Sequence, residues 1–246
     1  MYQFFVPEEN TGPEYVQITG SDVNHIKNVL RMRRGEKIRV STPAGDSWFC
    51  RIEELSAELV TARIEEADRL GTEPVCKVYL FQGLPKGDKM EFVVQKAVEL
   101  GVHEIIPVAM KNCVVKLDEQ RAANKTKRWQ SIAESAAKQA KRSVIPAVRT
   151  PVSFREAVKL AGELSLVTLV PYEKAHGLAA TRELMGGIPR GAGIGLMIGP
   201  EGGFAPEEID CADESGFHCI SLGRRILRTE TAGAAALAML VYALDE

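Results

Sequence analysis

Two glycine-containing segments near the C-terminal end of the chain follow apolar runs that are typical of buried strands. The first is IGPEGGF, residues 198–204, and the second is LGRRILRTETA, residues 222–232. Glycine at such a point allows a turn with positive φ or lets a ligand approach the main chain. Ligands of open α/β sheets bind at the carboxyl ends of neighbouring strands. The segments therefore indicate either a pair of tight turns or, as we expect, two sides of one ligand site.

The composition of these segments favours a nucleoside over a triphosphate. The glycines of GAGIG, residues 191–195, resemble part of a dinucleotide-binding motif, but they precede a strand and so cannot hold a pyrophosphate at a helix N-terminus. The chain also has no GxxxxGK[ST] phosphate-binding loop. What remains is a pocket of peptide groups and the small apolar side chains of Ile226 and Leu227, which suits an adenine ring.

The chain from residue 75 onward alternates between strand-like and helix-like sequence. Apolar runs predict strands within residues 75–83, 104–110, 164–172, 193–199 and 217–223. Residues 86–100 carry apolar side chains at helical spacing, and a longer helix is predicted over about 122–142, with Trp129 on its apolar face. The alternation predicts an α/β domain over residues 75–246, with a parallel sheet covered by helices on both faces.

Residues 1–70 follow a different pattern. Five short β-like runs occur at residues 2–6, 14–19, 37–42, 47–55 and 59–64. One helix is predicted over 21–32, with Ser21 or Asp22 as its N-cap. The pattern predicts a small N-terminal β-barrel domain over 1–70, followed by a linker at 67–74.

The overall composition is that of an ordinary globular protein. The 246 residues are 45% apolar and 26% charged. No apolar run approaches the ~18 residues of a membrane span, and the N-terminus lacks a secretory signal pattern. Five cysteines without CxxC spacing and four scattered histidines match no metal site or disulfide framework. We expect reduced thiols, no metal and a cytoplasmic location.

The distribution of charge is more informative than the net charge of −2. Residues 21–51 and 111–142 are rich in Lys and Arg, whereas residues 52–74 are acidic. Separate basic segments on a near-neutral chain are typical of an RNA-binding protein with a confined footprint, although solvated helix faces look similar. The residues that we expect to contact RNA phosphates are Arg31, Arg33, Arg34, Lys127, Arg128, Lys141 and Arg142.

The two C-terminal motifs resemble those of the SPOUT methyltransferases, specifically the RsmE family of 16S rRNA uridine-N3 methyltransferases. The similarity extends to HIKNVLRMRRGE near the start and to LPKGDKMEFVVQKAVELGV and RWQSIAESAAKQAKR in the middle. It implies a PUA-like N-terminal barrel, a catalytic domain with a C-terminal trefoil knot, a homodimer, and S-adenosylmethionine bound in a bent form at the knot. It also implies a partner, 16S rRNA in the small ribosomal subunit, methylated at the uridine that the family numbers 1498.

The resemblance assigns roles to the two motifs. The residues that we expect to contact S-adenosylmethionine, several through the backbone, are Gly199, Gly202, Leu222, Gly223, Ile226 and Leu227. Methylation at uracil N3 requires loss of a proton, after which negative charge gathers on O2, N3 and O4. Arg228 is our candidate for stabilising that charge, and Glu201 or Glu230 could accept the proton. The alternatives are a bracing ion pair from Arg228 to one of these carboxylates and, for Glu201, hydrogen bonds to nearby backbone amides.

Other functions stay open. A SPOUT ribose 2′-O-methyltransferase would share the cofactor motifs, and a non-catalytic RNA-binding ribosome-assembly protein could carry a degenerate pocket. Neither motif contains a cysteine nucleophile, which favours attack by nitrogen over methylation at carbon 5. Ser135 stands where the family often has Glu, which weakens any role for an acid on the long helix. The Ala-rich last helix, with Gly233, would let another backbone approach closely, either in a knot or in a dimer.

Overall fold

The computed structural model describes residues 1–69, 71–175 and 177–244, which divide into two compact units. Unit 1 comprises Met1–Glu73 and Ala137–Ile145, and unit 2 comprises Pro74–Ala136 and Pro146–Glu246. The division after Glu73 falls within the expected linker at 67–74, in which Leu70 lies outside the described residues. No pattern in the sequence predicts that residues 137–145 belong to unit 1.

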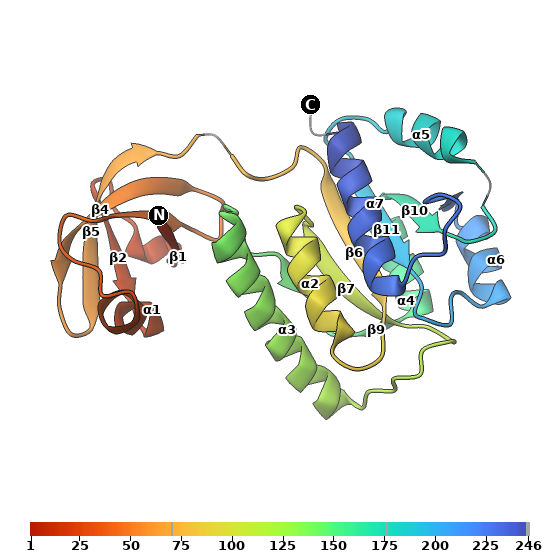
Figure 1. Ribbon diagram of the computed structural model, residues 1–246, viewed down its shortest axis with the longest axis horizontal. Helices are drawn as coiled ribbons and strands as arrows, with labels where there is room; N and C mark the ends of the chain where they lie inside the picture. The colour runs from red at the N-terminus through yellow and green to blue at the C-terminus, as the bar shows by residue number, and fades with distance from the viewer. Residues whose placement is uncertain (70, 176, 245–246) are drawn as a thin grey trace. The chain divides into compact units, whose positions relative to one another are not determined.

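Unit 1 is built on a curled five-stranded sheet (Figure 1). Its strands are β1 (Tyr2–Phe5), β2 (Tyr15–Thr19), β3 (Lys37–Ser41), β4 (Ser47–Leu55) and β5 (Leu59–Ala67). Their order is β1-β3-β4-β5-β2, with β1 parallel to β3 and the other neighbours antiparallel. Alternating residues such as Val16 and Ile18 are buried, which is the period expected of half-buried strands. All five predicted strands are confirmed, and the described residues show no β1–β2 pairing that would close a barrel.

The helix predicted over 21–32 is present but shorter. The 3₁₀ turn η1 (Glu8–Asn10) precedes it; α1 (Ser21–Asn24) then continues as the π-helical turn η2 (His25–Val29). Gly20, with φ of 69°, is the N-cap, so the prediction of Ser21 or Asp22 is wrong. The Asp22 carboxylate instead accepts a hydrogen bond from the Lys138 ammonium at 3.2 Å.

Buried polar contacts attach residues 141–143 to the rest of unit 1. The Arg39 guanidinium pairs with Asp68 at 2.7 Å and also donates to the Lys141 carbonyl. Arg142 pairs with the Glu73 carboxylate, which also accepts from the Ser143 backbone N–H at 2.9 Å. A buried charge is stable only when it is paired and hydrogen-bonded, so this stretch is an integral part of unit 1.

Unit 2 contains the predicted parallel sheet. Its strands are β6 (Lys77–Gly83), β7 (Glu104–Ala109), β8 (Ala147–Val148), β9 (Val152–Ser153), β10 (Val167–Pro171), β11 (Gly193–Ile198) and β12 (His218–Ile220). The order is β12-β10-β11-β6-β7-β8, with β9 also paired to β7, and every pairing is parallel. The predicted α/β architecture is confirmed.

Helices cover both faces of this sheet. The helices of unit 2 are α2 (Lys89–Glu99), α4 (Phe154–Glu163), α5 (Leu178–Gly186), α6 (Pro206–Glu214) and α7 (Thr229–Leu244), while α3 (Glu119–Ala140) begins in unit 2 and its last residues belong to unit 1. α2 and α7 pack side by side over one face, where α7 meets Leu80 and Ile198 (Figure 1). The intervening residues Phe81 and Met197 point to the other face and join a core with α4 and α6. No helix in the described residues is long and apolar enough to cross a membrane.

The order of strands corrects one expectation about the two motifs. IGPEGGF follows β11, and LGRRILRTETA follows β12, but these strands are not neighbours. β10 lies between them and pairs with both. The chain after β12 must therefore pass the end of β10 before α7 packs against β11 and β6.

Candidate functional site

All strands of the sheet in unit 2 are parallel, so their loops leave at one edge, and three of these loops follow the neighbouring strands β12, β10 and β11. The loop after β10 begins at Tyr172, whose backbone N–H donates to the Ile220 carbonyl at 3.0 Å. The sequence prediction omitted this loop, in which His176 lies outside the described residues. The only sign of this loop in the sequence is the apolar strand directly before Tyr172. That strand alone does not reveal the role of the loop, because the order of strands in a sheet cannot be obtained from one sequence.

A buried hydroxyl connects the loop after β11 to the start of α7. Thr229, at the start of α7, donates through Oγ1 to the Gly199 carbonyl at 2.7 Å. The same oxygen accepts from Gln82 Nε2 at 2.8 Å, and Gln82 is fully buried on β6. This chain of hydrogen bonds fixes the exit of β11 against the start of α7. The two motifs predicted to act together are thus joined directly, although their strands are separated.

The glycine-rich loop after β11 is packed tightly on one side. Asn112 Nδ2 donates to the carbonyls of Gly202 and Gly203 at 3.1 and 3.2 Å. A Cβ at Gly202 would lie 3.0 Å from the Asn112 Cβ, so no larger residue fits without displacing the loop. The requirement for glycine here is partly structural.

The loop after β12 is more open. Gly223 has φ of 112°, and a Cβ placed on it would meet nothing within 4 Å. Ile226 is 86% exposed, which is unusual for a large apolar side chain, while Leu222 and Leu227 are half-buried. Accessible backbone beside uncovered apolar side chains is what a planar aromatic ligand requires.

Glu201 is held by the segment that leads into α2. Its carboxylate accepts from the Lys86 backbone N–H at 3.1 Å and from the Lys89 ammonium at 2.8 Å. Partial burial raises the pKa of Glu201, but the hydrogen bonds from Lys89 and from backbone amides outweigh burial and hold that pKa below its usual range. Lys89 also lies 3.5 Å from Glu230 Oε2, so one lysine connects the two motifs. The structure therefore shows Glu201 bound to a nearby backbone amide, the alternative that the sequence left open.

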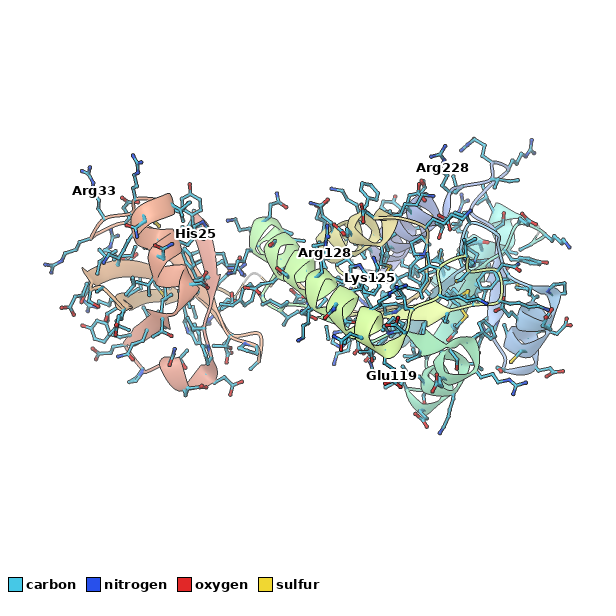
Figure 2. The ribbon with its side chains drawn as sticks, turned by 90° about the horizontal axis from the view of Figure 1, so that it is seen from below. His25, Arg33, Glu119, Lys125, Arg128 and Arg228 are labelled. Atoms are coloured by element: carbon cyan, nitrogen blue, oxygen red, sulfur yellow. The ribbon has the colours of Figure 1, made fainter. Side chains whose placement is uncertain are left out.

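Arg228 is not part of this ion-pair cluster. Its side chain is exposed, and Figure 2 shows it at the surface of unit 2 near the start of α7. Among the described residues no ion pair or hydrogen bond of its guanidinium occurs, so the bracing pair with Glu201 or Glu230 is absent there. Its charge is available to a ligand.

The predicted RNA-contacting residues are distributed over both units. Arg31, Arg33 and Arg34 are exposed on unit 1, and Arg33 is labelled there in Figure 2. Lys141 is exposed too, although its ammonium donates to the Met1 carbonyl. Arg142 is different, because it is 3% exposed and paired with Glu73. Its predicted phosphate contact does not fit this placement, and we leave Arg142 out of the RNA-binding set.

The long helix α3 supplies the other two basic candidates. Lys127 and Arg128 are exposed, and Arg128 pairs with Glu91 on α2 at 2.8 Å. Trp129 is 3% exposed, so its prediction as a core residue is confirmed. Ser135 is exposed and donates only to the Ser131 carbonyl of the preceding turn, so it offers no acid to a ligand.

The described part of the chain contains no cluster of three or more His, Cys, Asp or Glu side chains that could bind a metal ion.

The cysteines differ in burial. Cys50 and Cys76 are buried, Cys113 and Cys211 are partly buried, and Cys219 is exposed. Burial raises the pKa of Cys50 to about 12, with the negative charge of Glu65 adding to the effect. That thiol is inert at neutral pH.

Comparison with known proteins identifies the family. Residues 72–241 match the family described as "RNA methyltransferase domain", and residues 18–65 match "RNA methyltransferase PUA domain". Ribosomal RNA small subunit methyltransferase E of Bacillus subtilis is 37% identical over 229 residues, which cover 92% of this chain and 89% of that protein. The chain belongs to the RsmE family of RNA methyltransferases. The predicted PUA-like N-terminal domain and parallel-sheet C-terminal domain are therefore confirmed, with a curled sheet where a barrel was expected, and the trefoil knot stays a prediction.

Two solved methyltransferase structures match nearly the whole chain. Ribosomal RNA small subunit methyltransferase E from Neisseria gonorrhoeae, bound to S-adenosylmethionine, is 35% identical with a TM-score of 0.86, covering 99% of this chain and 98% of that one. A methyltransferase from Legionella pneumophila, in complex with the same cofactor, is 32% identical with a TM-score of 0.84, covering 100% of this chain and 98% of that one. The RsmE fold thus extends across both units of this protein.

Proposed function

We propose that this protein transfers a methyl group from S-adenosylmethionine to N3 of one uridine in the 16S rRNA of the small ribosomal subunit. The observation that carries the proposal is the close similarity, over 99% of the chain, to an RsmE structure that contains the cofactor. The site geometry supports it, because the loops after β10, β11 and β12 leave neighbouring strands at one edge of the sheet and the loop after β12 leaves its backbone accessible.

The residues of the loops after β11 and β12 fit S-adenosylmethionine. The open space beside Gly223 and the uncovered Ile226 side chain would accept the adenine ring, with Leu227 behind it. Backbone groups at Gly199, Gly202 and Leu222 would hold the polar edges of the adenosine. When bound, the cofactor supplies an electrophilic methyl group on a positively charged sulfur. The protein must present uracil N3 to that carbon and exclude water.

We assign Arg228 to the negative charge that develops on the uracil oxygens when N3 loses its proton. A positioned donor in a water-excluded site is worth about 3–4 kcal/mol of transition-state stabilisation. Arg228 suits this role because it is permanently cationic and no carboxylate in the described residues neutralises it. Glu201 is the carboxylate that we assign to accept the proton. The pairing with Lys89 lowers the pKa of Glu201 and makes it a weaker base, so catalysis depends more on stabilisation of the anion by Arg228.

Six exposed basic residues would hold the RNA backbone: Arg31, Arg33, Arg34, Lys127, Arg128 and Lys141. If each contacts one phosphate, the logarithm of the binding constant should fall with the logarithm of salt concentration with a slope of about −4 to −5. The target uridine must also leave its stack, which costs a few kcal/mol. The assembled small subunit, found in the cytoplasm, is the substrate that we expect.

We also expect a homodimer and a C-terminal trefoil knot, both implied by the family resemblance. Tyr242 on α7 is 87% exposed and Phe92 on the adjoining α2 is 48% exposed. Large apolar side chains on two packed helices are typical of a surface that another chain covers. Light scattering of the purified protein would give the mass of a dimer if this surface is used.

The test is methylation of small subunits from a strain that lacks the gene, with isotope-labelled S-adenosylmethionine. The proposal predicts one labelled base, released as N3-methyluridine and mapped to a single position. A label on the ribose would indicate a 2′-O-methyltransferase instead. No label, together with no cofactor binding by calorimetry at millimolar concentration, would indicate a non-catalytic RNA-binding protein.

A further inference from the structure

The proposed role of Arg228 creates a problem within its own motif. Glu230 follows two residues later, and Glu201 lies in the loop that Thr229 attaches to the start of α7. An arginine pairs readily with a nearby carboxylate through two parallel hydrogen bonds. Such a pair would neutralise the charge that the uracil anion needs.

The structure gives both carboxylates another cation. Lys89, at the first position of α2, donates a hydrogen bond from its ammonium to Glu201 Oε1 at 2.8 Å and forms an ion pair, without a hydrogen bond, with Glu230 Oε2 at 3.5 Å. The Lys86 backbone N–H binds the Glu201 carboxylate at 3.1 Å as well. These contacts are partly sheltered, because the side chains of Lys89, Glu201 and Glu230 are 35%, 26% and 16% exposed. The hydrogen bond to Glu201 raises the pKa of Lys89, so it stays charged at neutral pH.

Arg228 shows the complementary behaviour. It is exposed, and its guanidinium makes no ion pair with either carboxylate in the described structure. Figure 2 places it at the surface, on the side of unit 2 where α7 begins. Lys89 therefore pairs with the two carboxylates, whereas Arg228 faces solvent.

We propose that Lys89 is a positioning residue that occupies Glu201 and Glu230 and thereby keeps the Arg228 guanidinium available for the RNA base. This inference rests on the proposed function, since it assumes that an unpaired Arg228 assists methyl transfer. It differs from a simple bracing role in one consequence. If Lys89 only braces the loops, its removal should leave the chemical reactivity of the Arg228 guanidinium unchanged. If Lys89 occupies the carboxylates, its removal should let Arg228 pair with one of them and become less reactive.

The experiment compares variants of the full chain on small subunits that lack the modification. Lys89→Met should lower kcat about tenfold or more while the KM for S-adenosylmethionine changes less than about threefold. Lys89→Arg, which keeps the cation, should retain kcat within about threefold. The double variant Lys89→Met/Glu230→Gln should exceed Lys89→Met in kcat by about threefold or more, because one competitor is gone. Lys96→Met is the matched control, since Lys96 lies on the same helix but pairs with Glu99 at 2.8 Å, away from the loops.

A second measurement does not depend on activity. An arginine-selective dicarbonyl reagent should modify Arg228 more slowly in Lys89→Met than in the wild type, as quantified by peptide mass spectrometry, and Lys96→Met should not alter that rate. This readout also applies if the wild type fails to methylate uridine N3, in which case the proposed function is wrong while the pairing is still tested.

The inference is overturned if Lys89→Met keeps full kcat, or if the double variant is no faster than Lys89→Met. It is also overturned if the dicarbonyl reagent modifies Arg228 equally fast in both proteins. If Lys89→Met does not fold, Lys89→Arg decides: a loss of kcat there beyond about tenfold, with unchanged Arg228 reactivity, contradicts the inference.

Discussion

Replacement of Thr229 by valine tests how the cofactor loops are held together. Valine keeps the shape of threonine but removes the hydroxyl that donates to the Gly199 carbonyl and accepts from Gln82. Thr229 is 6% exposed and Gln82 is fully buried, so water cannot replace the lost partner easily. A buried polar group left unpaired costs about 1–3 kcal/mol. Gln82 Nε2 keeps a bond to the Gly83 carbonyl at 3.0 Å, which reduces the loss on that side.

The expected total is about 2–3 kcal/mol, from about 1–2 kcal/mol for the Gly199 carbonyl and about 1 kcal/mol for Gln82. For a domain of this size the midpoint of thermal unfolding should fall by about 5–10 °C. Because the Gly199 loop is released at the same time, affinity for S-adenosylmethionine should fall about five- to tenfold, equivalent to about 1–1.4 kcal/mol. Calorimetric titration with the cofactor measures this second effect directly.

Thr229→Ser is the matched control for this change. Serine keeps the hydroxyl and loses one methyl group, so its cofactor affinity should stay within about twofold of the wild type, with a stability loss of about 1 kcal/mol. The reasoning is refuted if valine and serine at this position give the same cofactor affinity. That result would mean that the hydrogen-bond chain through Thr229 does not shape the site.

Three further predictions follow from single residues. Gly202→Ala should weaken cofactor binding at least about fivefold, because its Cβ would lie 3.0 Å from that of Asn112, whereas Gly162→Ala, with nothing within 4 Å, should leave binding unchanged in the same titration. Arg228→Ala should lower turnover at least about tenfold with cofactor affinity within a few-fold, and an unchanged turnover would remove its catalytic assignment. Arg33→Ala should reduce the salt slope of RNA binding by about one, and an unchanged slope would exclude Arg33 from the phosphate contacts.

The elements of the fold were predictable because their sequence periods are strong. Apolar runs such as those of β6, β7 and β11 have few alternatives to buried parallel strands once helices separate them. The start of α1 was not predictable from capping preference, because Asp22 is drawn to Lys138 and Gly20 takes the N-cap.

The site was predictable in its motifs but not in its assembly. Local patterns carry no information on strand order, so the position of β10 between β11 and β12 had no sequence signal. In the sequence, Arg142 cannot be distinguished from other basic residues near a helix end. Its partner Glu73 is 69 residues away in the chain, so only the fold reveals their ion pair. Lys89 was likewise unremarkable in sequence, and only the fold brings it to Glu201 and Glu230.

The most direct measurement is a crystal structure of this protein with S-adenosylmethionine. If the loops after β10, β11 and β12 form the cofactor site, adenosine density should lie at the sheet edge between them, with the Ile226 side chain covered and Lys89 still paired with Glu201. Density at another place, or loops that close over each other without the cofactor, would contradict this assignment of the site.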